Sequence, residues 1–152
     1  MTRIDFYLLG PGATTVPTVC RLSEKAVSAG HRLYLRTADA ALAEDLDGAL
    51  WSFRQGGFVA HERYHGAAVE DPQPPVLLGA GEPPASHRGV LINLEADVPP
   101  WFSSFERVLE VVPEDAALRA PSRERFRFYR ERGYELNTFE QTAEGGWKLR
   151  AA

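Results

Sequence analysis

The segment SRERFRFYRERG, residues 122–133, combines arginines with aromatic rings, the side chains that recognise acidic peptides and nucleic acids. From Arg119 to Arg132 the chain has six arginines and two glutamates, a net charge of +4, whereas the whole protein carries −4. Guanidinium groups bind carboxylates and phosphates through charge-assisted hydrogen bonds. This concentration of positive charge in an acidic protein predicts a local anionic partner.

A helix over residues 114–132 would gather these groups on one face. At about 100° per residue, four of the arginines fall within about 80° of one another, with one phenylalanine inside that stripe. Both glutamates fall outside it, and the adjoining face, formed by Leu118, Ser122 and Tyr129, is expected to pack on a sheet. Pro121 would kink a helix that began before it, so the placement of Arg119 depends on local geometry. The arginine stripe consists of Arg119, Arg123, Arg127 and Arg130 around Phe126.

Two interpretations of the arginine stripe are open at this point. A surface helix commonly carries a solvated charged face that binds nothing. An acidic peptide with an apolar anchor would instead need positive groups around an accessible ring, as this stripe provides.

A glycine-rich turn could carry a different chemistry. LLGPGATT (8–15) lies between a predicted strand and a predicted helix, where nucleotide-binding folds hold phosphate. The phosphate-binding loop requires a lysine after its last glycine, and none follows Gly12. We therefore interpret this segment as a tight turn.

The segment HERYH (61–65) matches the H-E-x-x-H pattern of zinc proteases. That chemistry needs both histidines on one helix, but flanking glycines leave only eight residues between Gly57 and Gly66. The preceding Phe-Val pair favours a strand, in which the two histidines would be more than about 12 Å apart. We expect no metal site here.

The composition is that of one globular domain. The chain has 152 residues, of which 44% are hydrophobic and 25% charged, and no apolar run long enough to cross a membrane. Cys20 is the single cysteine, so no internal disulfide can form, and with no signal peptide a cytoplasmic location is expected. We expect one domain over residues 1–140 and a flexible C-terminal tail over 141–152.

The order of predicted elements indicates an α/β fold with a mostly parallel sheet flanked by helices. Two continuous apolar runs, VLLG and VLINL, are typical of central parallel strands. Strands are predicted at 3–9, 31–37, 58–61, 76–79, 90–94 and 107–112, and helices at 16–29, 38–51 and 114–132.

Several segments resemble the chi subunit family of bacterial DNA polymerase III. They are IDFYLL, VCRLSEKAVSAGHRLYLRT, LDGALWSF, FVAHE, GVLINL, FERVLEVVPED and RERFRFYRERGYEL, in the family's order and spacing from about residue 3 to residue 138. The resemblance implies a nucleotide-binding-like fold without a phosphate loop. It also implies an accessory subunit of the clamp-loader complex that is not an enzyme and needs no cofactor.

The resemblance further implies two protein partners. Chi proteins bind the acidic C-terminal tail of single-stranded DNA-binding protein, which ends in Pro-Phe, and so contact nucleic acid only indirectly. Carried over by position, the tail pocket maps to Val112, Arg119, Arg123 and Phe126, and Arg127 and Arg130 extend it.

The second implied partner is the psi subunit, which tethers chi to the clamp loader. Its contact surface maps to Trp51 in LDGALW and Phe58 in FVAHE. Ala60 stands where the family commonly has proline, which is a departure from the pattern. The alternative interpretation of Trp51 and Phe58 is that they are ordinary core aromatics.

Two other functions remain open on the residues alone. The α/β order and the GPGATT turn are compatible with a nucleotide-binding enzyme, which would bind ATP or a dinucleotide. The arginine helix is compatible with direct binding of single-stranded nucleic acid through aromatic stacking, which would depend steeply on salt.

Overall fold

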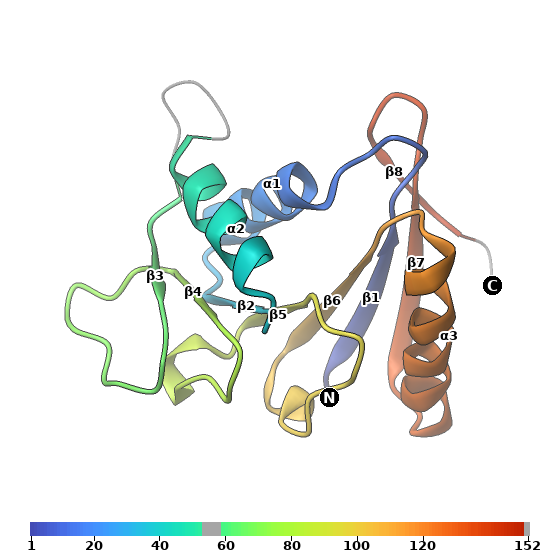
Figure 1. The fold of residues 1–152 in the computed structure, drawn as a ribbon. Helices are drawn as coiled ribbons and strands as arrows, with labels where there is room; N and C mark the ends of the chain where they lie inside the picture. Colours follow the sequence, from blue (N-terminus) through green and yellow to red (C-terminus); the bar gives the residue numbers. More distant parts are fainter. Residues whose placement is uncertain (53–58, 151–152) are drawn as a thin grey trace.

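The described part of the chain folds around an eight-stranded sheet with helices on both faces (Figure 1). The computed structural model describes residues 1–52 and 59–150, and the strands within them join in the order β3-β4-β2-β5-β6-β1-β7-β8. All neighbouring strands are parallel except β7 and β8. The strands are β1 (Arg3–Leu8), β2 (Leu33–Arg36), β3 (His61–Arg63), β4 (Val76–Gly79), β5 (Val90–Asn93), β6 (Arg107–Val112), β7 (Glu135–Gln141) and β8 (Trp147–Leu149). The helices are α1 (Thr15–Ser28), α2 (Ala40–Ser52) and α3 (Ala116–Glu131), with 3-10 turns at Ala85–His87 and Phe102–Ser104.

The helices cover opposite faces of the sheet because the crossovers run in opposite directions. The connections through α1 and α2 lead toward the β3 edge, whereas the connection through α3 leads from β6 toward β8. Right-handed crossovers then place α1 and α2 on one face and α3 on the other, as Figure 1 shows. Since β1 lies between β6 and β7, α3 packs across β1. The predicted α/β class is confirmed.

Each face has its own apolar core. On the α1–α2 face the core includes Val19 and Leu46, and on the α3 face it includes Phe6 and Tyr129. All four residues of β5 are buried, as expected for a central parallel strand. Among the described residues, no helix is both long and apolar enough to cross a bilayer.

The C-terminal segment differs from the expectation. Residues 141–152 were expected to form a flexible tail, but β7 continues to Gln141 and β8 pairs with it in antiparallel register. The ring of Trp147 packs edge-on against Tyr7 at 5.0 Å, and Phe139 stacks on the same ring at 5.0 Å. This apolar contact with β1 holds the hairpin in place, so the expected tail is corrected to a β-hairpin for residues 141–149.

Helix α3 is continuous through its internal proline. Asp115 caps it, since its side chain accepts a hydrogen bond from the backbone N–H of Ala117 at 2.8 Å. Pro121 lies inside the helix and cannot donate to the preceding turn, yet the helix runs on to Glu131. Gly133, with φ of 78°, ends it in the left-handed region that favours glycine. Arg119 is therefore helical, as the arginine stripe requires.

Candidate functional site

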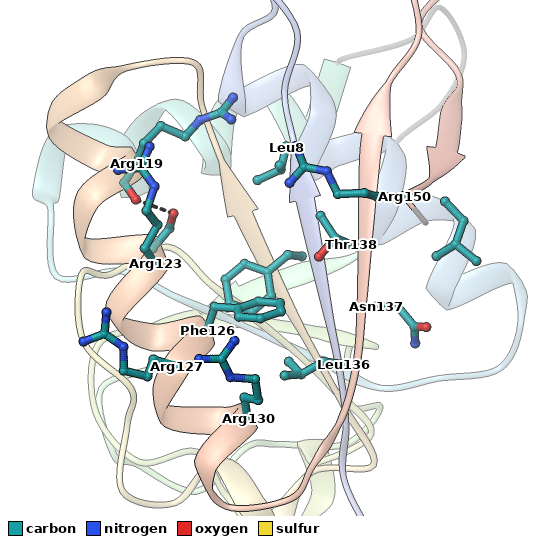
Figure 2. A pocket seen from close by; sticks show the side chains of 13 residues that line it. Leu8, Arg119, Arg123, Phe126, Arg127, Arg130, Leu136, Asn137, Thr138 and Arg150 are labelled. Carbon is teal, nitrogen blue, oxygen red and sulfur yellow. Dashed lines mark hydrogen bonds between the residues drawn. The ribbon is translucent and has the colours of Figure 1, made fainter. Parts of the chain in front are cut away.

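An open groove of about 870 Å³ lies between α3 and the strands β1 and β7 (Figure 2). One wall is α3 and the other is the C-terminal hairpin, while β1 lies beneath. Five arginines line the groove, and no acidic residue is among the described residues that line it. The lining residues are Phe6, Leu8, Arg119, Ser122, Arg123, Phe126, Arg127, Arg130, Leu136, Asn137, Thr138, Leu149 and Arg150.

The floor of the groove is apolar. Phe126 is half-buried and packs edge-on against Phe6, with ring centroids 5.4 Å apart. Leu8 from β1 and Leu136 from β7 complete this surface, and both are only partly buried. The groove therefore combines an accessible apolar floor with a positive rim, which suits an anionic ligand carrying an apolar side chain.

The four arginines of the stripe differ in how much of their hydrogen-bonding capacity is already used. Arg119 donates to the backbone carbonyls of Pro113 and Leu9, both at 2.9 Å, and so ties the start of α3 to the end of β1. Within the described part of the chain, the guanidinium of Arg123 makes no hydrogen bond or ion pair. The hydrogen-bonding capacity of Arg123 is therefore open to a ligand.

The other two stripe arginines have weak partners. Arg127 pairs with Glu124 at 3.3 Å, and both side chains are more than half exposed, so the pair contributes little. One of the two glutamates that lie outside the stripe thus contacts it, through a single exposed ion pair. The guanidinium of Arg130 lies over the ring of Phe126, 6.0 Å from its centroid. Both groups remain at the rim of the groove.

Val112 does not line this groove. It is 1% exposed and borders a second, smaller cavity of about 240 Å³, together with Leu118, Pro121 and Arg125. The reason is the strand order: α3 leaves β6 and crosses β1, so the groove opens over β1 and β7 while β6 lies on the other side of the helix. The face of α3 expected to pack on the sheet does so at Ser122 and Tyr129, which are 6% and 0% exposed, but the expectation is wrong for Leu118, which is 44% exposed.

A buried ion pair occupies the sheet-facing side of α3. Arg125 donates from Nε to the Glu110 carboxylate at 2.9 Å, and the two side chains are 8% and 0% exposed. The Tyr129 hydroxyl and the Asn93 amide also donate to this carboxylate, at 2.7 and 3.1 Å. Burial raises the pKa of the Glu110 carboxyl, and these three donors oppose that effect. The network fixes the rotation of α3 and thereby the direction in which the stripe faces.

Sequence reasoning missed the second wall of the groove. Residues of β7 and β8 contribute Leu136, Asn137, Thr138, Leu149 and Arg150. A signal existed in YELNTFEQ (134–141), where Leu, Thr and Phe residues suited to a strand precede the Gly145–Gly146 turn. The buried role of Arg125 was also missed, because an arginine between two surface arginines looks equally solvated from the sequence.

A separate surface feature lies at the C-terminal end of α2. Trp51 is 56% exposed, which contradicts the interpretation of this residue as a core aromatic. Its ring lies 5.1 Å from that of His61, whose Nε2 is 2.6 Å from Asp47 Oδ1. Phe58, the second residue assigned to the psi contact, lies outside the described residues.

The HERYH segment and the glycine-rich turn adopt the local structures expected for them. His61–Arg63 is strand β3, so the HERYH segment is not a helix, and no metal-ligand cluster occurs among the described residues. The glycine turn is bound by its own chain: Gly10 N–H donates to Gln141 Oε1 at 2.9 Å, and Arg119 donates to the adjacent Leu9 carbonyl. Two backbone groups at the start of the turn are therefore already hydrogen-bonded within the protein.

Among solved structures, the crystal structure of T4 UvsW is similar to this chain with a TM-score of 0.61. The similarity covers 91% of this chain and 41% of that one at 7% identity, which shows a shared fold alone.

Relatives found by sequence share a much higher identity with this chain. The DNA polymerase III subunit chi of Pseudomonas aeruginosa is 48% identical over 139 residues, which cover 90% of this chain and 94% of the relative. Those of Haemophilus influenzae and Escherichia coli are 31% and 29% identical, covering 88% and 91% of this chain and 94% and 97% of the relatives. The family model described as DNA polymerase III chi subunit, HolC, matches residues 1–137. This chain therefore belongs to the DNA polymerase III chi subunit family.

Proposed function

We propose that this protein is a non-catalytic subunit that binds the acidic C-terminal tail of single-stranded DNA-binding protein in the groove between α3 and β7. In doing so it links DNA-bound protein to the clamp loader of the replication machinery. The observation that carries the proposal is the combination of five arginines with an apolar floor and no carboxylate among the described residues that line the groove.

The chemistry of the tail matches each part of the groove. Its aspartates and terminal carboxylate are attracted by the exposed guanidinium groups of the rim. Its terminal phenylalanine can pack on Phe126 beside Leu8, where aromatic burial stabilises the complex. Because the tail is disordered when free, ordering it costs entropy, so the contact should be readily released.

Isothermal titration calorimetry with a peptide copying that tail tests the proposal. We expect one peptide per chain, and an affinity that falls severalfold as salt rises from about 0.05 to about 0.3 M, because the rim charges are exposed and screened. A peptide lacking the terminal phenylalanine should bind much more weakly, since it loses the apolar contact.

A bare single-stranded oligonucleotide of similar charge is the matched comparison. If it bound more tightly than the peptide, the groove would be a nucleic-acid site and the tail proposal would be wrong. Absence of peptide binding at low salt would also overturn it.

We propose that the Trp51 surface holds the psi subunit or an equivalent clamp-loader component. Trp51 supports this because it is a large aromatic left more than half exposed, the type of residue that anchors protein interfaces. Helix α2, which contains Trp51, lies on the face of the sheet opposite α3 (Figure 1), so the two partners would bind separate surfaces.

Trp51→Ala is expected to weaken capture of the clamp loader by at least about tenfold, because truncating an interface tryptophan commonly costs that much. Tail-peptide affinity should stay unchanged. Pull-down with purified clamp loader measures the effect, and Leu118→Ala, which truncates another exposed apolar side chain, is the control. Equal capture by the two variants would contradict the assignment.

A further inference from the structure

The far wall of the groove extends into a part of the chain beyond the family match. The family model ends at residue 137, whereas Leu149 and Arg150 line the groove. Figure 2 shows the Arg150 side chain extending from the end of β8 over the groove toward Leu8, opposite the arginines of α3. The groove therefore has positive groups on two sides.

The position of Arg150 is set by backbone pairing. Its N–H donates to the Thr138 carbonyl at 2.7 Å, which continues the β7–β8 ladder by one residue beyond Leu149. The hairpin is in turn held on β1 by Trp147 against Tyr7 and by Gln141 bound to Gly10. Arg150 thus stands on an ordered element rather than on a free tail.

The ion pair that Arg150 makes in this structure is weak. Its guanidinium pairs with Glu140 Oε1 at 2.7 Å, and the two side chains are 57% and 45% exposed. Pairs this exposed contribute little net energy, so an incoming carboxylate can displace or share this contact. Glu140 is not among the groove-lining residues, and its charge moderates that of Arg150.

We infer that Arg150 is a second recognition element, which binds a carboxylate on the side of the bound peptide that faces away from α3. This inference rests on the proposed function. Successive side chains of an extended peptide point in opposite directions, so one wall can reach only alternate residues. The α3 arginines take the carboxylates on one side of the tail, and Arg150 takes one on the other side.

Titration of the tail peptide into Arg150→Gln tests the inference. We expect about three- to tenfold weaker binding, as for loss of one partly exposed charged hydrogen bond. Lys148→Gln is the matched control, because it removes the same charge two residues away, in β8, at a residue that does not line the groove. The affinity of Lys148→Gln for the tail peptide should stay within about twofold of that of the wild type.

Glu140→Gln provides a test of opposite sign. Removing the carboxylate that competes for Arg150 should tighten peptide binding, whereas Glu144→Gln, the same change in the exposed β7–β8 turn, should have a smaller effect. Both glutamates are far enough exposed that folding should be unaffected, which circular dichroism checks.

The outcomes separate the two proposals. If the wild type binds and Arg123→Ala weakens binding, but Arg150→Gln behaves as Lys148→Gln does, the inference is wrong and the proposed function stands. Glu140→Gln binding no more tightly than Glu144→Gln would also overturn the inference. If the wild type does not bind the peptide at all, both proposals fail.

Discussion

Arg125→Met is expected to lower the free energy of unfolding by about 3–5 kcal/mol at pH 7, the largest effect we expect from any single substitution in α3. Methionine retains most of the side-chain volume, so the loss comes mainly from the charge. It leaves the Glu110 carboxylate, which is fully buried, without its cation. Urea unfolding followed by circular dichroism measures the effect as a lower midpoint with an unchanged slope.

The loss of stability in Arg125→Met should increase as pH rises. Burial already raises the pKa of Glu110 above its ordinary value of 4.5, and Arg125 opposes that rise. In the variant the folded-state pKa is higher still, so the folded state favours the protonated carboxyl. The variant therefore keeps its stability below about pH 4.5, where Glu110 is protonated in both the folded and the unfolded state. As pH rises above this value, its free energy of unfolding falls by up to about 1.4 kcal/mol per pH unit, until Glu110 also ionises in the folded state.

Glu110→Gln in the Arg125→Met background is the control for this mechanism. It removes the unpaired carboxylate, so the double variant should be more stable than Arg125→Met alone at pH 7, and its stability should vary less with pH. A single variant as stable as the wild type at pH 7 would show that the ion pair contributes nothing net. If the difference in free energy of unfolding between wild type and Arg125→Met does not decrease at low pH, the loss comes from packing and not from charge.

Arg123→Ala is expected to weaken binding of the tail peptide by at least about tenfold. Arg123 is exposed, lines the groove and has no hydrogen-bond or ion-pair partner within the described residues. A charge-assisted hydrogen bond from its guanidinium to a peptide carboxylate is worth about 1.5–3 kcal/mol, or about 10- to 150-fold in affinity. Calorimetric titration of wild type and variant under identical salt measures the ratio.

The control for Arg123 is a second arginine of the same segment. Arg132→Ala removes the same charge just after α3, but Arg132 packs over Phe128 and does not line the groove. It should change peptide affinity by less than about twofold. Thermal unfolding of Arg123→Ala should match the wild type, because a solvated arginine contributes little to folding. If folded Arg123→Ala binds the tail peptide as tightly as the wild type, the arginine stripe is a solvated charged face that does not bind the peptide.

The sequence by itself determined the features that depend on local geometry. Apolar runs identified six of the strands of the sheet, although the third is shifted to His61–Arg63, and helical periodicity placed four arginines and Phe126 on one stripe. The chi-like segments identified the family that the comparisons confirm. Each of these inferences needs only the fixed rise and rotation per residue of a helix or strand, or a match of residues in order.

The tertiary structure alone decided what lies opposite the arginine stripe. β1, the first strand, inserts between β6 and β7, so α3 crosses it and the groove opens over β1 and β7 rather than beside Val112. The same packing buries Arg125 against Glu110 and brings Arg150 to the far wall. Strand order and contacts between distant residues arise from how the layers pack, and periodicity along one segment carries no record of them.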